Sequence, residues 1–230
     1  MTRAETLTLM AVHAHPDDEA STTGGILARY SAEGVRTVVV TCTNGELGDG
    51  HEAAKPGEEG HDESWVVATR RRELEESCEI LGVTALELLG YKDSGMMGWP
   101  QNEAEGSFWK TPVAEAAGRL SELVERYRPQ VVVTYDANGF YGHPDHIQAH
   151  RITVAALEAT AIPDKLYFPG IPKSGLAVFR DALRSAGIEA PDEVADEDWD
   201  FGVPDELISA VVDCSGYATQ QFAALEAHAS

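Results

Sequence analysis

Two short apolar runs, residues 7–12 and 131–135, each lead into a cluster of histidine and carboxylate side chains. The first is followed by Ala14-His15-Pro16-Asp17-Asp18-Glu19 and the second by Tyr141-Gly142-His143-Pro144-Asp145-His146. A short apolar run bounded by polar residues is typical of a buried strand. The fold must therefore bring together the ends of two strands that lie far apart in the sequence.

Strand-like and helix-like segments alternate along the rest of the chain. Ser21-Thr22-Thr23 is expected to cap the first helix. Further strands are predicted over 35–42, 86–89, 165–168 and 207–212, and helices over 21–33, 66–81, 113–127, 146–160, 176–186 and 217–228. This alternation predicts an α/β fold with a Rossmann-like, mainly parallel sheet flanked by helices. Ligands of such folds bind at the carboxyl ends of the strands, where both clusters fall.

The chain is expected to divide into a metal-binding catalytic core and a smaller extension. The core covers residues 1–161, and residues 162–230 form a C-terminal cap that packs on the core and shapes the pocket. A long loop over 90–111 carries Trp99, Phe108 and Trp109 outside any helical spacing. Such residues suggest a wall or lid over a pocket, with ordinary packing of the loop on the core as the alternative.

The charge of the chain limits its partners. Thirty-nine acidic residues stand against 17 basic ones, which gives a net charge of -22. A surface this acidic repels phosphate backbones and anionic membranes, so we expect a small-molecule substrate and neither nucleic acid nor membrane. No apolar segment approaches the ~18 residues of a membrane span, and we expect a soluble, cytoplasmic protein. The oligomeric state stays open, with a homo-oligomer among the compatible states.

The spacing within the two clusters suits a metal ion. His15 and Asp18 are three residues apart, as are His143 and His146. A catalytic zinc ion takes about three protein ligands and keeps one position open, so at least one of these four residues should be a catalyst. We assign His15, Asp18 and His146 as ligands. Histidine and carboxylate ligands do not select one divalent ion, so Fe²⁺ or another ion stays an alternative to Zn²⁺.

The remaining polar residues of the clusters have the chemistry of an amide hydrolase. Asp17 is placed as the general base that takes a proton from the attacking water. His143, in its protonated form, is placed opposite to stabilise the oxyanion and protonate the leaving amine. Asp145 can fix the tautomer of an imidazole, and Tyr141 can add an O–H donor. His13 is expected to be packed, and surface positions are expected for His51, His61, His150 and His228.

These two clusters resemble those of the PIG-L/LmbE-like family of zinc-dependent de-N-acetylases, near the branch of the mycothiol deacetylase and the mycothiol S-conjugate amidase. The resemblance covers roughly residues 9–161 and implies the roles given above. It also implies that Arg70, in an Arg-x-x-Glu pattern with Glu73, and Asp93 bind the substrate, since directional hydrogen bonds suit a sugar. Relatives of this branch are expected to continue beyond Ser230.

The leading hypothesis is a zinc-dependent hydrolase that removes an acetyl group from an N-acetylglucosamine-containing small molecule. A second keeps the chemistry but cuts a thiol conjugate, as a mycothiol S-conjugate amidase, or serves a specialised biosynthetic pathway as a deacetylase. Two non-enzymatic alternatives are a nucleotide-binding α/β protein and a sugar-binding or metal-holding module. No G-x-G-x-x-G or Walker pattern follows the first strand, which argues against nucleotides.

Overall fold

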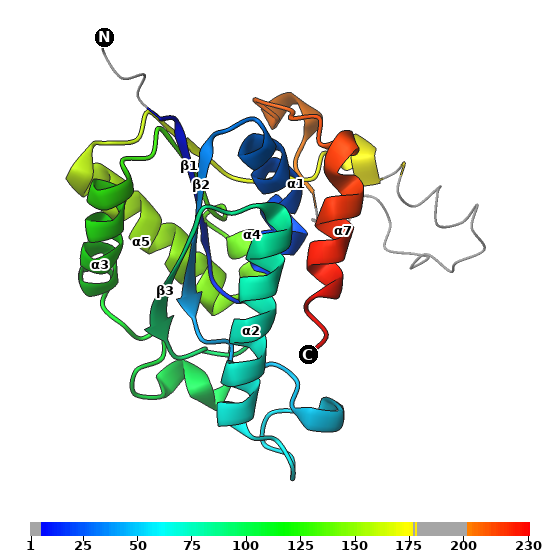
Figure 1. Ribbon diagram of the computed structural model, residues 1–230. Coiled ribbons are helices and arrows are strands. Elements are labelled where there is room, and N and C mark those ends of the chain that lie inside the picture. Colours follow the sequence, from blue (N-terminus) through cyan, green and yellow to red (C-terminus); the bar gives the residue numbers. More distant parts are fainter. Residues whose placement is uncertain (1–5, 177, 179–201) are drawn as a thin grey trace. The chain divides into compact units, whose positions relative to one another are not determined.

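The computed structural model in Figure 1 describes residues 6–176, 178 and 202–230. The chain forms two compact units, Met1–Phe168 with Cys214–Ser230, and Pro169–Asp213. The larger unit holds the whole sheet and both polar clusters. In the smaller unit, Pro172 and Val203 form an isolated parallel β-bridge. The Ser174 hydroxyl donates a hydrogen bond to the Asp205 carboxylate. The boundary at residue 161 and the pocket-shaping role of residues 162–230 stay predictions.

The larger unit is built on a five-stranded sheet in the order β3-β2-β1-β4-β5, and every pairing is parallel. The strands are β1 Thr8–His13, β2 Arg36–Thr43, β3 Ala85–Tyr91, β4 Val131–Val133 and β5 Lys165–Tyr167. The chain leaves β1 towards β2 and β3 on one side and later continues to β4 and β5 on the other. The strand order therefore reverses between β1 and β4, the place where open α/β sheets bind ligands. The predicted Rossmann-like parallel sheet is confirmed.

Helices cover both faces of this sheet (Figure 1). All six residues of β1 are buried, and their side chains alternate between two cores. Met10 and Val12 pack with α3 Val113–Tyr127 and α5 Pro144–Thr160, while Leu9 and Ala11 pack with helices on the opposite face. Those helices are α1 Asp18–Ala32, α2 Glu63–Leu81 and α7 Ala218–Glu226. Burial on both faces explains why the strand reads as a continuous apolar run.

The ends of α2 follow the usual rules of helix termination. The Asp62 side chain accepts hydrogen bonds from the backbone N–H groups of Ser64 and Trp65, so the helix begins three residues before the predicted position. Gly82 ends it in the left-handed conformation, with φ 71°. A glycine has no Cβ to oppose this conformation, which is why it marks helix ends in sequence. The long predicted loops also contain short 3₁₀ turns, His51–Ala53 and Pro100–Glu103.

Two of the elements predicted from the sequence differ in the structure, and a third lies mostly outside the described residues. The Ser21-Thr22-Thr23 cap is wrong, because α1 begins at Asp18 with Asp17 at its N-cap. The strand over 207–212 is also wrong: the structure shows the 3₁₀ turn Asp205–Leu207 there and no strand pairing among the described residues. Most of the predicted helix over 176–186 lies outside the described residues. Across the described ranges, no helix has the length and apolar character needed to cross a membrane.

Candidate metal centre and active site

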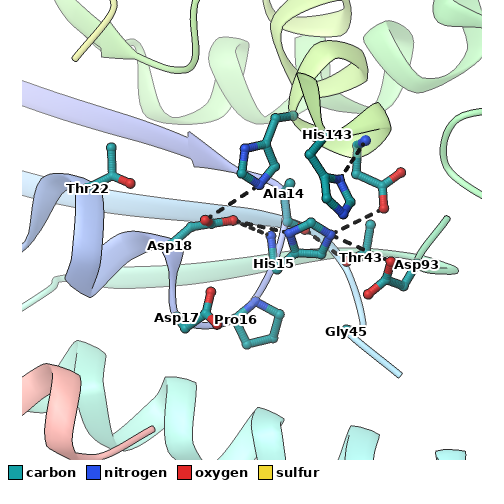
Figure 2. Close-up of polar contacts among 12 residues, drawn as sticks. Ala14, His15, Pro16, Asp17, Asp18, Thr22, Thr43, Gly45, Asp93 and His143 are labelled. Atoms are coloured by element: carbon teal, nitrogen blue, oxygen red, sulfur yellow. Dashed lines mark hydrogen bonds and ion pairs between the residues drawn. The ribbon is translucent and has the colours of Figure 1, made fainter. Parts of the chain in front are cut away.

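The two polar clusters meet at the carboxyl ends of β1 and β4. The imidazole centroids of His15 and His143 are 4.7 Å apart, those of His143 and His146 4.9 Å, and those of His15 and His146 5.3 Å. Asp18 lies beside them, with its carboxylate 3.4 Å from Nδ1 of His15 and 3.7 Å from Nε2 of His146. Figure 2 shows the His15 ring between the carboxylates of Asp18 and Asp93. The pairing of β1 with β4 thus produces the expected convergence.

Each cluster lies at the start of a helix, at the carboxyl end of the strand before it. His143 is the N-cap of α5, where its Nδ1 accepts the backbone N–H of Asp145 over 3.2 Å, and Pro144 takes the first helical position. Proline is suited to that position because it has no N–H to leave unpaired. On the other side Asp17 is the N-cap of α1, with φ 103° in the left-handed region. Such a backbone is unusual for a residue other than glycine and points to a functional constraint.

The donor set fits a divalent metal ion. His15, His143 and His146 can each place one ring nitrogen within 4.8 Å of the others. Neither ring nitrogen of buried His146 has a hydrogen-bond partner. Burial lowers the pKa of His146 to about 4, so the ring is neutral and keeps a lone pair for a metal. A buried imidazole with no partner is otherwise costly, which a metal would resolve.

Negative charge gathers around His15. Burial disfavours the charged form of this ring, but Asp93, Asp145 and Asp18 outweigh that effect and raise its pKa well above the usual range. Asp18 is itself buried, yet its hydrogen bond to His15 and the nearby His146 hold its pKa well below the usual range. The carboxylates therefore create a field that favours positive charge at this place, as a cation site requires.

Asp145 contacts His15, whereas the sequence alone did not say which imidazole it would orient. Its Oδ2 accepts the backbone N–H of Ser94 over 2.8 Å and lies 3.2 Å from Nε2 of His15. Asp93 supports the same ring from 3.7 Å, and its Oδ1 accepts the backbone N–H of Gly95. A metal-binding histidine is commonly oriented by a carboxylate on its second nitrogen. Here Nδ1 of His15 faces Asp18 and Nε2 faces Asp145.

Asp17 is held by Arg70. Nη2 of Arg70 donates to Oδ2 of Asp17 over 2.7 Å and to the carbonyl of Pro16 over 2.6 Å, while Nη1 donates to the carbonyl of Gly45 over 3.1 Å. The Asp17 side chain is still 47% exposed. Partial desolvation and repulsion from Asp18 raise its pKa to about 6, against the opposing effect of Arg70. A carboxylate with this pKa is ionised at neutral pH and remains a useful base.

The surroundings of His143 favour a neutral ring, and the protonated form expected from the sequence stays a prediction. Burial and the neighbouring His15 lower its pKa to about 4. Because Nδ1 accepts the Asp145 N–H, the ring proton lies on Nε2. An Nε2–H group can donate a hydrogen bond but cannot bind a metal. This tautomer favours His15, Asp18 and His146 as the ligand set over a set of three histidines.

A cavity of about 240 Å³ opens above these residues. Arg70, Asp93 and Tyr141 line it, together with Met96 and Trp99 from the loop after β3. Tyr141 is half exposed at its mouth and belongs to the irregular turn α4 Gly139–Gly142. The predicted wall is therefore present, but only part of the loop forms it.

The other aromatic residues of the loop pack elsewhere. Phe108 is fully buried and stacks on Tyr91 at 5.1 Å, and Trp109 lies under the guanidinium of Arg151. These side chains fix the loop on the body of the larger unit and leave the cavity wall to Met96 and Trp99.

Several residues around the site were not predicted from the sequence. Tyr135 stacks on His146 with centroids 4.1 Å apart, and its hydroxyl accepts the backbone N–H of Ala14. Its place at the end of a predicted strand that leads to the site was an available signal. His228, expected at the surface, is buried against Glu19, with Nε2 2.8 Å from Oε1. No local pattern near residue 228 indicates this contact. His13 is packed as expected, with Nε2 2.8 Å from the Thr23 hydroxyl.

The sequence of this chain matches one family of known proteins. Residues 10–157 match the model of a family described as PIG-L: GlcNAc-PI de-N-acetylase. A relative from Acidothermus cellulolyticus named 1D-myo-inositol 2-acetamido-2-deoxy-alpha-D-glucopyranoside deacetylase is 44% identical over 230 residues, which cover 96% of this chain and 78% of the relative. The match spans both clusters, Arg70 and Asp93.

Solved structures agree on the fold. N,N'-diacetylchitobiose deacetylase from Pyrococcus horikoshii superposes with a TM-score of 0.63 at 20% identity, covering 97% of this chain and 70% of that one. The zinc-inhibited form of teicoplanin deacetylase gives a TM-score of 0.58 at 21% identity, covering 96% and 83%. At such identities the likeness shows the fold alone.

Proposed function

Because this chain belongs to the PIG-L family of GlcNAc-PI de-N-acetylases, we propose that it hydrolyses the N-acetyl amide of an N-acetylglucosamine unit linked to inositol, releasing acetate and the free amine. The similarity to a relative named for this activity, 44% identical over nearly the whole chain, carries the choice of substrate. The convergence of His15, Asp17, Asp18, His143 and His146 carries the choice of chemistry.

His15, Asp18 and His146 are the proposed ligands of a divalent metal ion, with Zn²⁺ as first choice and Fe²⁺ as the alternative. The unpartnered nitrogens of His146 and the carboxylate field around His15 support this assignment. When bound, the ion supplies Lewis-acid chemistry: it polarises the amide carbonyl and makes water more acidic. Asp145, and more weakly Asp93, would orient His15 from its second nitrogen.

Asp17 acts as the general base in this proposal. It lines the cavity beside the ligands, and its pKa of about 6 lets it accept a proton from water near neutral pH. The hydrogen bond from Arg70 fixes the direction of its carboxylate. The proton taken from the attacking water can then pass to the amine that leaves.

His143 stabilises the negative charge that develops on the amide oxygen. His143 lines the cavity, and because Nδ1 accepts the Asp145 N–H, Nε2 is the ring nitrogen left to donate. A preorganised donor of this kind costs no reorganisation at the moment of reaction. Tyr141, half exposed at the mouth of the same cavity, is proposed as a second donor to that oxygen.

Arg70 and Asp93 are proposed to bind the sugar and the inositol. Both line the cavity. The pKa of Asp93 is held well below its usual range: burial opposes this shift, but His15 and the Gly95 N–H favour the charged form. Asp93 is thus an ionised acceptor for hydroxyl groups. Arg70 makes three hydrogen bonds to the protein, which hold it in the cavity wall beside Asp17 where it can also contact the substrate.

An amidase that cuts larger thiol conjugates is the second candidate. Met96, Met97 and Trp99 are 41%, 52% and 40% exposed on the loop beside the cavity. Exposed apolar side chains next to a polar site would suit a bulky apolar group. None of the named relatives given above carries an amidase name, so this activity ranks second. The cytoplasmic location expected from the sequence stays a prediction.

Three substrates separate these functions. Metal-reconstituted protein is incubated with N-acetylglucosamine, N-acetylglucosaminyl-inositol and a bimane conjugate of mycothiol, and mass spectrometry measures acetate and free amine. The proposal predicts acetate and amine in equal amounts from N-acetylglucosaminyl-inositol, at the highest kcat/KM of the three. Cleavage of the conjugate alone would reassign the protein to the amidase, and no turnover of any substrate by metal-loaded protein would reject both.

A further inference from the structure

A buried carboxylate lies directly behind the turn that carries Asp17. The side chain of Glu19 is fully buried. Its Oε2 accepts the backbone N–H of Asp17 over 3.0 Å, and its Oε1 accepts the Ser77 hydroxyl over 2.5 Å. Nε2 of His228 lies 2.8 Å from the same Oε1. Glu19 is neither a proposed metal ligand nor a lining residue of the cavity, so the mechanism above does not account for it.

Glu19 contacts Asp17 at a residue whose backbone has an unfavourable conformation. Asp17 has φ 103°, a conformation that its Cβ disfavours. Rotation of this peptide towards an ordinary conformation would break the bond to Oε2 of Glu19. On the other side of the turn, Arg70 holds the carboxylate of Asp17 and the carbonyl of Pro16. Asp17 is therefore restrained through its main chain by Glu19 and through its side chain by Arg70.

His228 contacts Glu19 from a part of the chain that is distant in sequence. Its side chain is 7% exposed, and it reaches Glu19 from the segment that follows α7. Two side chains anchor that helix: Gln221 donates to the carbonyl of Ala20, and Gln220 donates to that of Ile80. Figure 1 shows α7 beside α1 and α2. A segment distant in sequence is thereby tied to the turn that carries the base.

A buried carboxylate is stable only when donors satisfy it. The three donors to Glu19 are an amide, a hydroxyl and an imidazole, and each comes from a different part of the chain. Loss of the imidazole would leave Oε1 with one donor and would let the carboxylate shift away from Asp17. The effect would reach the base without any change at a metal ligand.

We propose that Glu19 and His228 form a positioning pair that holds Asp17 in its left-handed conformation and so sets the direction of the general base. This inference rests on the proposed function, because it gives Asp17 the role of base. It predicts that the pair contributes to kcat and contributes little to substrate binding, since neither residue lines the cavity.

The test compares two changes at one position. His228→Leu removes the donor and roughly keeps the volume, whereas His228→Gln keeps an N–H donor. Ser230→Ala is the matched control, because the Ser230 hydroxyl lies in the same segment but donates to Glu73 and not to Glu19. Each protein is measured for kcat and KM of acetate release, for bound metal, and for hydrogen exchange of the Asp17 amide.

With metal content unchanged, His228→Leu should lower kcat about tenfold, as expected for one lost hydrogen bond, and leave KM within about twofold. His228→Gln should recover most of the loss, and Ser230→Ala should match wild type. The Asp17 amide should exchange faster in His228→Leu alone of these three. Ser77→Ala, which removes the hydroxyl donor with a small change of volume, should repeat the pattern if His228→Leu fails to fold.

Wild-type kcat and wild-type exchange in a folded, metal-loaded His228→Leu protein would overturn the inference. Equal losses in His228→Leu and His228→Gln would overturn it too, because they would show a packing role. Failure of the proposed function has a different signature. In that case wild type releases no acetate, while the exchange of the Asp17 amide still reports whether the pair restrains the turn.

Discussion

Nη2 of Arg70 lies 2.7 Å from Oδ2 of Asp17, and the same nitrogen also donates to the carbonyl of Pro16. One guanidinium therefore fixes both the carboxylate of the proposed base and the backbone just before it. A lysine has no planar fork and cannot make these bonds together with the one to Gly45. This relationship links a residue of α2 to the chemistry at the end of β1.

Replacement of Arg70 should therefore reduce catalysis while the charge is kept. Arg70→Lys is expected to lower kcat/KM roughly thirtyfold, which corresponds to about 2 kcal/mol for a charge-assisted hydrogen bond. Arg71→Lys is the control, because Arg71 is exposed and pairs only with Glu75 in the described structure. Steady-state kinetics of acetate release compare the two. Equal activity of both variants would show that Arg70 does not support the proposed base.

The ligand set can be separated by metal content. His146→Ala should lose the ion, because neither ring nitrogen of His146 has a hydrogen-bond partner and Nε2 lies 3.7 Å from Asp18, another proposed ligand. His143→Ala should keep the ion and lose about 10²- to 10³-fold in kcat, as expected for a lost oxyanion donor. Plasma mass spectrometry of dialysed protein gives the metal content. A metal-free His143→Ala protein would instead support a ligand set of three histidines.

Asp145→Asn should weaken metal binding about 10- to 100-fold, because Asp145 faces the second nitrogen of His15. The asparagine can still accept the Ser94 N–H, so the loop is expected to keep its place. Asp164→Asn, at an exposed position, is the control. Competition with a fluorescent chelator measures the affinity. An unchanged affinity would mean that Asp145 does not orient His15.

The turn that carries Tyr141 depends on Gly139. Its φ is +63°, and a Cβ built there would lie 2.7 Å from the backbone nitrogen of Ile147. Gly139→Ala is therefore expected to lower the free energy of unfolding by about 2 to 5 kcal/mol, from the strained φ and the overlap together.

Gly57→Ala isolates the first of these effects. Gly57 has φ +86°, but its Cβ would meet nothing within 4 Å. We expect a cost of only about 1 to 2 kcal/mol there. Urea unfolding of both variants gives the comparison, and equal costs would show that the approach of Ile147 to Gly139 is not close in solution.

The sheet and the meeting of the two clusters could be predicted from the sequence, because they depend on local patterns. The strand residues of β1 form an apolar run since both faces of the sheet are covered, and the topology of α/β sheets then places both clusters at one edge. The spacing and this edge predict that His15, Asp18, His143 and His146 meet, and the choice of His15, Asp18 and His146 as ligands is an assignment among these four. Their roles stay predictions.

The errors arose where a distant contact overrides local preference. Ser21 to Thr23 are good capping residues, yet α1 begins at Asp18, where Glu19 and Arg70 stabilise the left-handed Asp17. Residues 207–212 have strand-like side chains but no strand partner in the described structure, and Val211 is 87% exposed. His228 became buried only because α7 returns to α1 and α2. No pattern near these residues carries that information.

The proposed mechanism depends most on Asp17 as the base of a deacetylation. The decisive measurement is the initial rate of acetate release from N-acetylglucosaminyl-inositol by wild type and Asp17→Asn at equal bound metal. An asparagine keeps the shape of the side chain but cannot take a proton, so kcat should fall about 10²- to 10⁴-fold while the metal and the fold are retained. Full activity of a folded, metal-loaded Asp17→Asn protein would contradict the mechanism proposed for this site.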